Sequence, residues 1–168
     1  MHKAIVPLGC VLCLLLGAGG ASAAGAHQHG VAQLTVATEG NRLELELSSP
    51  LESLVGFEHE PRNDKERKAV QAMKDSFRKP EALFAPSVAA QCSAAPAEVE
   101  LPGGDSKDGH ADMHAAVAFE CKTPAALKDL EVKLFDSFPR LQRLKVQLVA
   151  GGKQSGTELT RQKRRLAW

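Results

Sequence analysis

The feature that most restricts the fold is a regular alternation of apolar and polar residues near the start of the chain. The alternation runs on both sides of the turn sequence EGN, with apolar side chains at Ala32, Leu34, Val36, Leu43, Leu45 and Leu47. A two-residue period places successive side chains on opposite faces of a strand. The stretch therefore predicts a β-hairpin with one buried and one exposed face.

The rest of the chain mixes strand and helix signals. A helical period from 64 to 79 ends before Pro80, and residues 51–61 predict an irregular or briefly helical connection. Short runs at 96–101, 113–121 and 144–148 predict further strands, and residues 157–168 predict a last one. A second helix is expected over 123–139, with Thr123 as its N-cap and Pro124 in its first turn.

These elements follow the order ββαββαββ. Strands that come in adjacent pairs favour an antiparallel sheet. We therefore expect an α+β fold in which two helices pack on one face of the sheet.

The first 26 residues have the pattern of a secretory signal peptide: Lys3, a short apolar run and then small residues. Cleavage after Ala23, Ala24 or Ala26 fits the small-residue rule, which leaves 27–168 as a single domain. No later segment is apolar for long enough to span a membrane, so no membrane insertion is expected after cleavage. Without the leader, basic and acidic residues balance, which argues against nucleic acid as the main partner.

The mature chain retains two cysteines, Cys92 and Cys121. In an exported protein, an isolated pair favours a disulfide over a metal or redox site, the alternative being two free buried thiols. The strand alternation turns Cys121 inward, where it could meet Cys92 across the core. A disulfide closing such a loop typically contributes about 2–4 kcal/mol.

Sequence motifs of enzymes are missing, since there is neither a G-x-S-x-G elbow nor an H-E-x-x-H pair. The chain is therefore not expected to be an enzyme. The basic run RQKRR near the end could contact nucleic acid or lipid, but the exposed face of a last strand explains it as well.

The strongest candidate metal ligands lie in the segment DSKDGHADMH. On an extended chain His110, Asp112 and His114 share one face, opposite the apolar Met113. Two imidazoles and a carboxylate suit Zn²⁺, and Asp108 or Asp105 could supply a fourth ligand. The alternative is an ordinary polar loop that leads into a strand.

The sequence HQH places His27 and His29 two residues apart, so the pair can chelate if the first strand begins that early. A frayed terminus is the alternative. A cut after Ala26 or Ala24 would also put His29 or His27 third from the new amino terminus. The resulting square-planar nitrogen site favours copper or nickel over zinc.

A third candidate is His59, which lies between Glu58 and Glu60 in the sequence GFEHEP. On its own, such a histidine is more often a solvated surface residue. It becomes a metal candidate only if the fold brings it near one of the other histidines.

The order of several segments resembles the ZrgA-like periplasmic zinc-uptake proteins of Gram-negative bacteria, a family long catalogued as a domain of unknown function. The similar segments are AHQHGVAQLTVATEGNRLELELSSP, LVGFEHEP, KPEALF, FEC and LFDSFP, and they cover nearly all of the mature chain.

The resemblance implies a non-catalytic periplasmic protein that binds Zn²⁺ and assists an ABC-type zinc transporter or its substrate-binding protein. His27, His29 and His59 fall at positions of the family pattern. The family's long loop rich in His, Asp and Glu is reduced here to a segment with Asp108, His110, Asp112 and His114. The resemblance makes Zn²⁺ the expected cargo. The alternatives are a copper or nickel carrier that uses the amino-terminal site and an interaction domain whose histidines bind no metal.

Overall fold

The computed structural model describes residues 28–101 and 111–168. The strands are β1 (Val31–Glu39), β2 (Arg42–Pro50), β3 (Phe84–Pro86), β4 (Cys92–Ala94), β5 (Glu98–Glu100), β6 (Asp112–Cys121), β7 (Asp129–Val132), β8 (Arg143–Ala150), β9 (Lys153–Thr160) and β10 (Arg165–Ala167). The α-helices are α1 (Leu51–Val55), α2 (Asp64–Phe77) and α3 (Leu134–Ser137). Three short 3-10 helices cover Pro80–Ala82, Val88–Ala90 and Pro124–Ala126.

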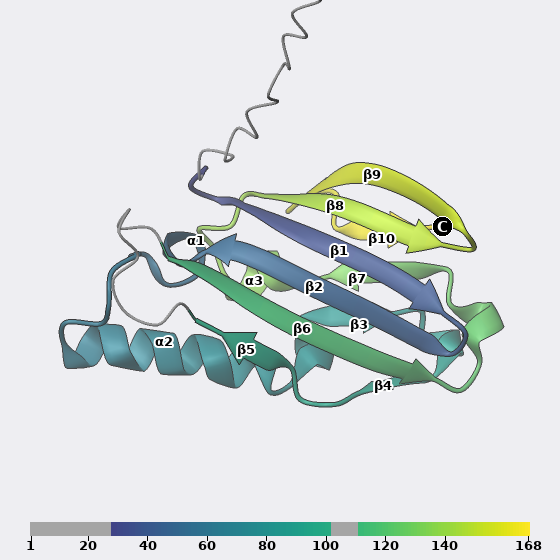
Figure 1. Cartoon of the computed structure of the whole chain (residues 1–168), viewed down its shortest axis with the longest axis horizontal. Coiled ribbons are helices and arrows are strands. Elements are labelled where there is room, and N and C mark those ends of the chain that lie inside the picture. Colours follow the sequence, from purple (N-terminus) through teal and green to yellow (C-terminus); the bar gives the residue numbers. More distant parts are fainter. Residues whose placement is uncertain (1–27, 102–110) are drawn as a thin grey trace, which may run out of the picture.

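Seven strands form a large sheet in the order β4-β6-β2-β1-β8-β9, with β5 also paired to β6 (Figure 1). β1 and β2 form the hairpin that the alternation predicts, with Leu34 opposite Leu47. The chain reverses at Gly40, whose φ of 59° is a conformation that glycine adopts without strain. The hairpin is thus the centre of the sheet.

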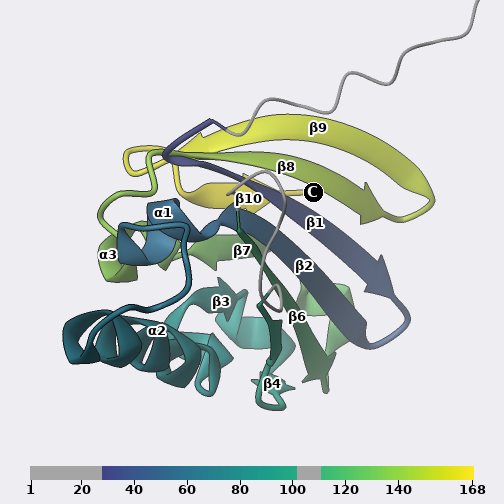
Figure 2. The same ribbon diagram turned by 60° about the vertical axis from the view of Figure 1, so that its left-hand side comes forward.

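A second layer covers one face of the large sheet. It contains α2, α3 and a three-stranded sheet in the order β10-β7-β3 (Figure 2). Side chains from both layers are fully buried between them, among them Leu34, Leu43, Leu45, Leu47, Phe77, Phe84, Met113, Phe119, Leu130 and Phe135. The α+β class is confirmed, and among the described residues no second layer covers the other face of the large sheet.

A disulfide joins Cys92 of β4 to Cys121 of β6, which are direct partners in the sheet. The S–S distance is 2.04 Å and 29 positions separate the two residues. The predicted bridge is therefore confirmed. It ties the short edge strand β4 to the longest strand of the sheet.

The predicted helix over 123–139 is wrong. Thr123 makes no side-chain cap, and the segment contains a 3-10 turn, then β7 and then the single turn α3. Leu130 and Val132 alternate in β7 and pair with β10 and β3, respectively. Leu127, Leu130 and Leu134 have helical spacing by coincidence, because each belongs to a different local structure.

Three further expectations about topology need correction. The order ββαββαββ is not what the chain adopts, since short strands such as β3, β7 and β10 form a separate sheet. The large sheet is mixed, because β1 and β8 run parallel, with Leu34 beside Val146. The tail is not one strand: β9 and β10 belong to different sheets.

Within the described ranges, no helix has the length and apolar character needed to cross a membrane. The predicted leader with its cleavage sites, and therefore the domain boundary at 26, lie outside those ranges.

Candidate metal-binding residues

His29 lies in a turn immediately before β1. Its backbone is held on both sides: the N–H of Val31 donates to the carbonyl of Gln28, and the N–H of Gly30 donates to the buried hydroxyl of Ser53. Gly30 has a φ of 75°, and a Cβ there would lie 3.1 Å from the carbonyl oxygen of Arg140. The turn is therefore packed against its neighbours, which differs from the frayed terminus that the sequence left open.

The His29 ring is two-thirds exposed and contacts α1. Its Nδ1 lies 3.1 Å from Oε2 of Glu52, and the other carboxylate oxygen lies 3.7 Å from Nη1 of Arg140. A carboxylate oxygen accepts a hydrogen bond, so Nδ1 is the donor and Nε2 takes no part in this contact.

His59 lies in the connection between α1 and α2, beside Glu58. Its Nδ1 lies 2.8 Å from the carbonyl oxygen of Glu60, and its ring stacks on Phe57 with a centroid distance of 5.1 Å. Glu66 at the start of α2 is 3.9 Å away from the same nitrogen. The backbone N–H of Arg62, which donates to Glu66, holds the pKa of that carboxyl below its usual range, and His59 adds a smaller lowering effect.

Asp112 and His114 both occupy β6, with the buried Met113 between them, as the alternation predicts. Asp112 is half-buried and pairs with Pro50, whereas His114 is exposed between Glu100 of β5 and Ser48 of β2. The next exposed position of β6 is Ala116, which lies between Glu98 and Glu46.

These strands form an open groove of about 380 Å³ on the exposed face of the large sheet. Its lining residues are Gln33, Thr35, Glu46, Leu47, Ser48, Glu98, Glu100, His114, Ala115 and Ala116. Because the side chain of Ala116 is small, the space between Glu98 and Glu46 stays open. No lysine or arginine is among the described residues of this lining.

The three glutamates of the groove, Glu46, Glu98 and Glu100, are therefore not neutralised locally. In the described part of the chain, no ion pair or side-chain hydrogen bond involves any of them. Directly opposed residues in a sheet have Cβ atoms about 4.5–5.5 Å apart, and diagonal ones are still within reach of long side chains. His114 and the three glutamates line the same groove, and we call these four residues the groove set.

The candidate ligands converge only partly. His29, Asp112 and His114 lie at the same end of the large sheet, where β1 and β6 begin, and α1 lies there too (Figure 1). Across 28–101 and 111–168, however, no three His, Cys, Asp or Glu side chains are close enough together to hold a metal ion. His27, Asp105, Asp108 and His110 lie outside the described residues.

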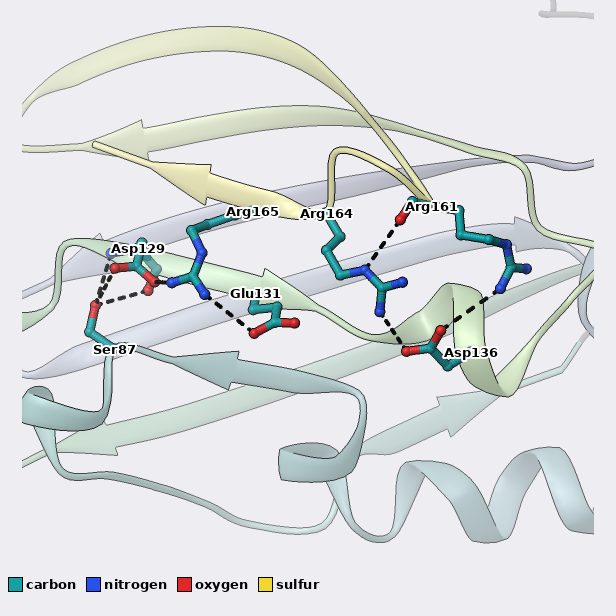
Figure 3. A network of polar contacts seen from close by, with 7 residues as sticks. All are labelled: Ser87, Asp129, Glu131, Asp136, Arg161, Arg164 and Arg165. Carbon is teal, nitrogen blue, oxygen red and sulfur yellow. Dashed lines mark hydrogen bonds and ion pairs between the residues drawn. The ribbon is translucent and has the colours of Figure 1, made fainter.

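The basic run near the end of the chain is engaged in ion pairs within the fold (Figure 3). Arg165 on β10 contacts Asp129 at 2.7 Å and Glu131 at 3.4 Å, both on β7. Arg164 and Arg161 contact Asp136 of α3 at 2.6 Å and 3.8 Å. We call Asp129, Glu131 and Asp136 the paired set. Their contacts account for the arginines of the RQKRR run, which attach β10 and the residues before it to β7 and α3.

A family model described as "ZrgA family zinc uptake protein" matches residues 26–168. The chain belongs to the ZrgA family. A search of curated proteins finds no match. ZrgA membership links the chain to zinc uptake, a role that is not enzymatic, and confirms the resemblance seen in the sequence.

Sequence reasoning missed the carboxylates that surround the two best-placed histidines. The sequence places Glu52 in a connection, Glu46 on the exposed face of the hairpin, and Glu98 and Glu100 in a short predicted strand, without marking any of them as a ligand. The alternating pattern does place these three glutamates on exposed faces, but it does not show which strands become neighbours.

Proposed function

We propose that this protein binds Zn²⁺ in the periplasm and buffers it or passes it to an ABC-type zinc uptake system. The observation that carries the proposal is the groove set: an exposed imidazole that shares a groove with three carboxylates, none of which has a cationic partner in the described chain. Family membership supports zinc as the cargo.

The chemistry of the donor set fits Zn²⁺. Zinc in proteins is held by imidazole nitrogen and carboxylate oxygen at about 2.0–2.2 Å, usually by four ligands. His114 and its direct neighbour Glu100 supply two, and Glu46 and Glu98 supply the others from across Ala116. Rotation of long side chains over a fixed sheet brings such donors together, and a cation removes the repulsion that keeps carboxylates apart.

The other histidines extend the proposal beyond the groove. His110 and Asp108 belong to the segment between Leu101, which follows Glu100, and Ala111, which precedes Asp112. Both ends of that segment are attached beside the groove, so we propose these residues as additional ligands. His27, His29, His59 with Glu58, and Asp112 complete the proposed ligands.

An exposed site suits a protein that exchanges its metal with a partner. The groove lies on the solvent face of the sheet and is open, so a bound ion can leave without unfolding of the core. A structural zinc site, by contrast, contributes directly to the folding of the protein. The proposed partner is the transporter itself or its substrate-binding protein.

The test is calorimetric titration with Zn²⁺ of protein secreted with its own leader and purified from the periplasm. We expect wild-type protein to bind, and His114→Ala to weaken binding by about tenfold or more. The matched control is Glu120→Gln, an exposed glutamate of the same strand that Arg42 and Asn41 already engage. This control should leave the zinc affinity unchanged.

Two outcomes would contradict the proposal. Absence of zinc binding by the wild type would remove it altogether. Tighter binding of Cu²⁺ or Ni²⁺ that survives His114→Ala would favour the amino-terminal copper or nickel carrier instead. Mass spectrometry of the mature amino terminus would then show whether His27 or His29 stands third.

A further inference from the structure

The imidazole of His29 is oriented by a chain of contacts that reaches from the turn before β1, through α1, to the segment before β8. Nδ1 lies 3.1 Å from Glu52 Oε2, and Glu52 Oε1 lies 3.7 Å from Arg140 Nη1. Glu52 is only 23% exposed, so its carboxylate is held between the ring and the guanidinium rather than free in solvent.

The position of Arg140 depends on a glycine. Gly56, which ends α1 with a φ of 94°, has no side chain, and a Cβ there would lie 2.9 Å from Nε of Arg140. The guanidinium therefore occupies space that any other residue would fill. This packing places Arg140 beside the carboxylate oxygen of Glu52 that His29 does not contact.

The backbone that carries the ring is fixed separately. The carbonyl of Gly30 accepts hydrogen bonds from the N–H groups of Gln142 and Arg143, at 2.8 Å and 3.0 Å. Together with the Ser53 contact, these bonds hold the turn before β1 against α1. Ring and backbone are thus both held by contacts within the protein.

We propose that Glu52 and Arg140 are positioning residues that prepare His29 as a metal ligand through Nε2. The inference rests on the proposed function, because it assigns a second point of zinc contact in the same protein. A histidine that binds a metal through one nitrogen commonly donates its other N–H to a carboxylate, which selects the tautomer and makes the ligating nitrogen more basic. The contact between His29 and Glu52 has this geometry, and His29 does not line the groove.

The first measurement needs no metal. Long-range proton–nitrogen NMR of the apo-protein at mildly alkaline pH reports which ring nitrogen carries the proton. We expect the Nδ1–H tautomer for His29 in the wild type. In Glu52→Ala the ring should move toward the Nε2–H tautomer that histidine prefers in water. Glu52→Gln keeps an acceptor oxygen and should largely restore the wild-type signal.

The second measurement is a double-mutant cycle of zinc affinity. Glu52→Ala should weaken binding by about 10–100-fold in the wild-type background, because it removes an outer partner of a ligand. In the His29→Ala background the same change should have no further effect, which a merely structural role of Glu52 would not produce. The matched control is Glu131→Ala, a similarly exposed glutamate paired with Arg165 and remote from His29. Arg140→Gln should give a smaller loss than Glu52→Ala.

The outcomes separate this inference from the proposed function. An Nε2–H tautomer in the wild type, or an equal effect of Glu52→Ala with and without His29, would overturn the positioning role. If His29→Ala leaves zinc affinity unchanged while His114→Ala lowers it, the inference fails and the proposed function stands. Absence of zinc binding in every protein would overturn both.

Discussion

The paired set and the groove set each contain three acidic residues, and the two groups of acids differ in what surrounds them. In the paired set, Asp129, Glu131 and Asp136 each contact an arginine of the carboxyl-terminal segment (Figure 3). In the groove set, the glutamates line one groove with a histidine and, within the described chain, no arginine or lysine lines that groove. Both sets are reached by solvent, so burial does not explain the difference.

The comparison separates acids that attach one element to another from acids that are available to a cation. The arginines of the paired set come from β10 and the residues before it, and their contacts join that strand to β7 and α3. Ser87 strengthens the arrangement, because its hydroxyl accepts hydrogen bonds from the N–H groups of Lys128 and Asp129. Among the described residues, no such contact involves the glutamates of the groove set, and the repulsion between them is a small cost to the fold.

The largest expected effect comes from neutralising each set in turn. Changing Glu46, Glu98 and Glu100 together to glutamine should lower zinc affinity by at least about 100-fold, since even the loss of an outer partner typically costs about 10–100-fold. The free energy of unfolding should stay the same or rise by about 0.5 kcal/mol, because like charges on neighbouring strands are removed. Zinc titration and urea unfolding of the apo-protein measure the two quantities.

The paired set provides the converse experiment. Replacing Asp129, Glu131 and Asp136 by their amides should leave zinc affinity unchanged and lower the free energy of unfolding by about 1 kcal/mol, because exposed ion pairs each contribute little. If instead both triple variants lost zinc binding equally, net negative charge rather than the groove would explain the affinity.

The sequence was sufficient to predict the parts of this fold that depend on local alternation. The β1–β2 hairpin, α2, β6 and β8 were all visible as two-residue or helical periods, and the periodicity of β6 also placed Asp112 and His114 on one face. The disulfide followed from cysteine count and from the inward position of Cys121. Each of these features involves residues close together in the chain or a rule of composition.

What could not be predicted depends on pairing between distant segments. Glu98 and Glu46 flank Ala116 only because β6 lies between β5 and β2, and no local pattern specifies that neighbourhood. The parallel contact of β1 with β8 joins segments more than 100 positions apart. His29 likewise meets Glu52 through folding, since no turn signal connects residues 23 positions apart.

Lowering the pH is expected to have a smaller effect on zinc affinity. This experiment tests whether the groove binds Zn²⁺ through imidazole or through carboxylates alone. A protonated imidazole cannot bind a metal, and the ordinary imidazole pKa is about 6.5. Zinc affinity should therefore fall by about tenfold per ligating histidine between pH 7.5 and 5.5. Titrations in the two buffers, repeated with His114→Ala, measure the change, and the variant should show a weaker pH dependence. An affinity that does not change with pH in the wild type would count against histidine ligation.

The smallest effect is expected at Glu66. Like the acids of the paired set, its carboxylate has a partner within the fold, but this partner is a backbone N–H rather than an arginine. It accepts from the N–H of Arg62 and from the Asn63 amide, whose oxygen in turn caps α2 by accepting from the N–H of Glu66. The hydrogen bond from Arg62 lowers the Glu66 pKa from its ordinary value of 4.5. A carboxyl whose pKa is lower in the folded state stabilises the fold above that ordinary value, and the contribution is lost as pH falls through the lowered pKa.

Glu66→Gln should therefore reduce the free energy of unfolding slightly at pH 7 and not at pH 3, as measured by urea unfolding at both pH values. Glu39→Gln, in a strand residue with no side-chain hydrogen bond among the described residues, should show no such difference. If both variants changed the free energy of unfolding alike at both pH values, general charge effects rather than the helix cap would account for the result. Glu66 would then not resemble the paired set, whose acids stabilise the fold through specific contacts.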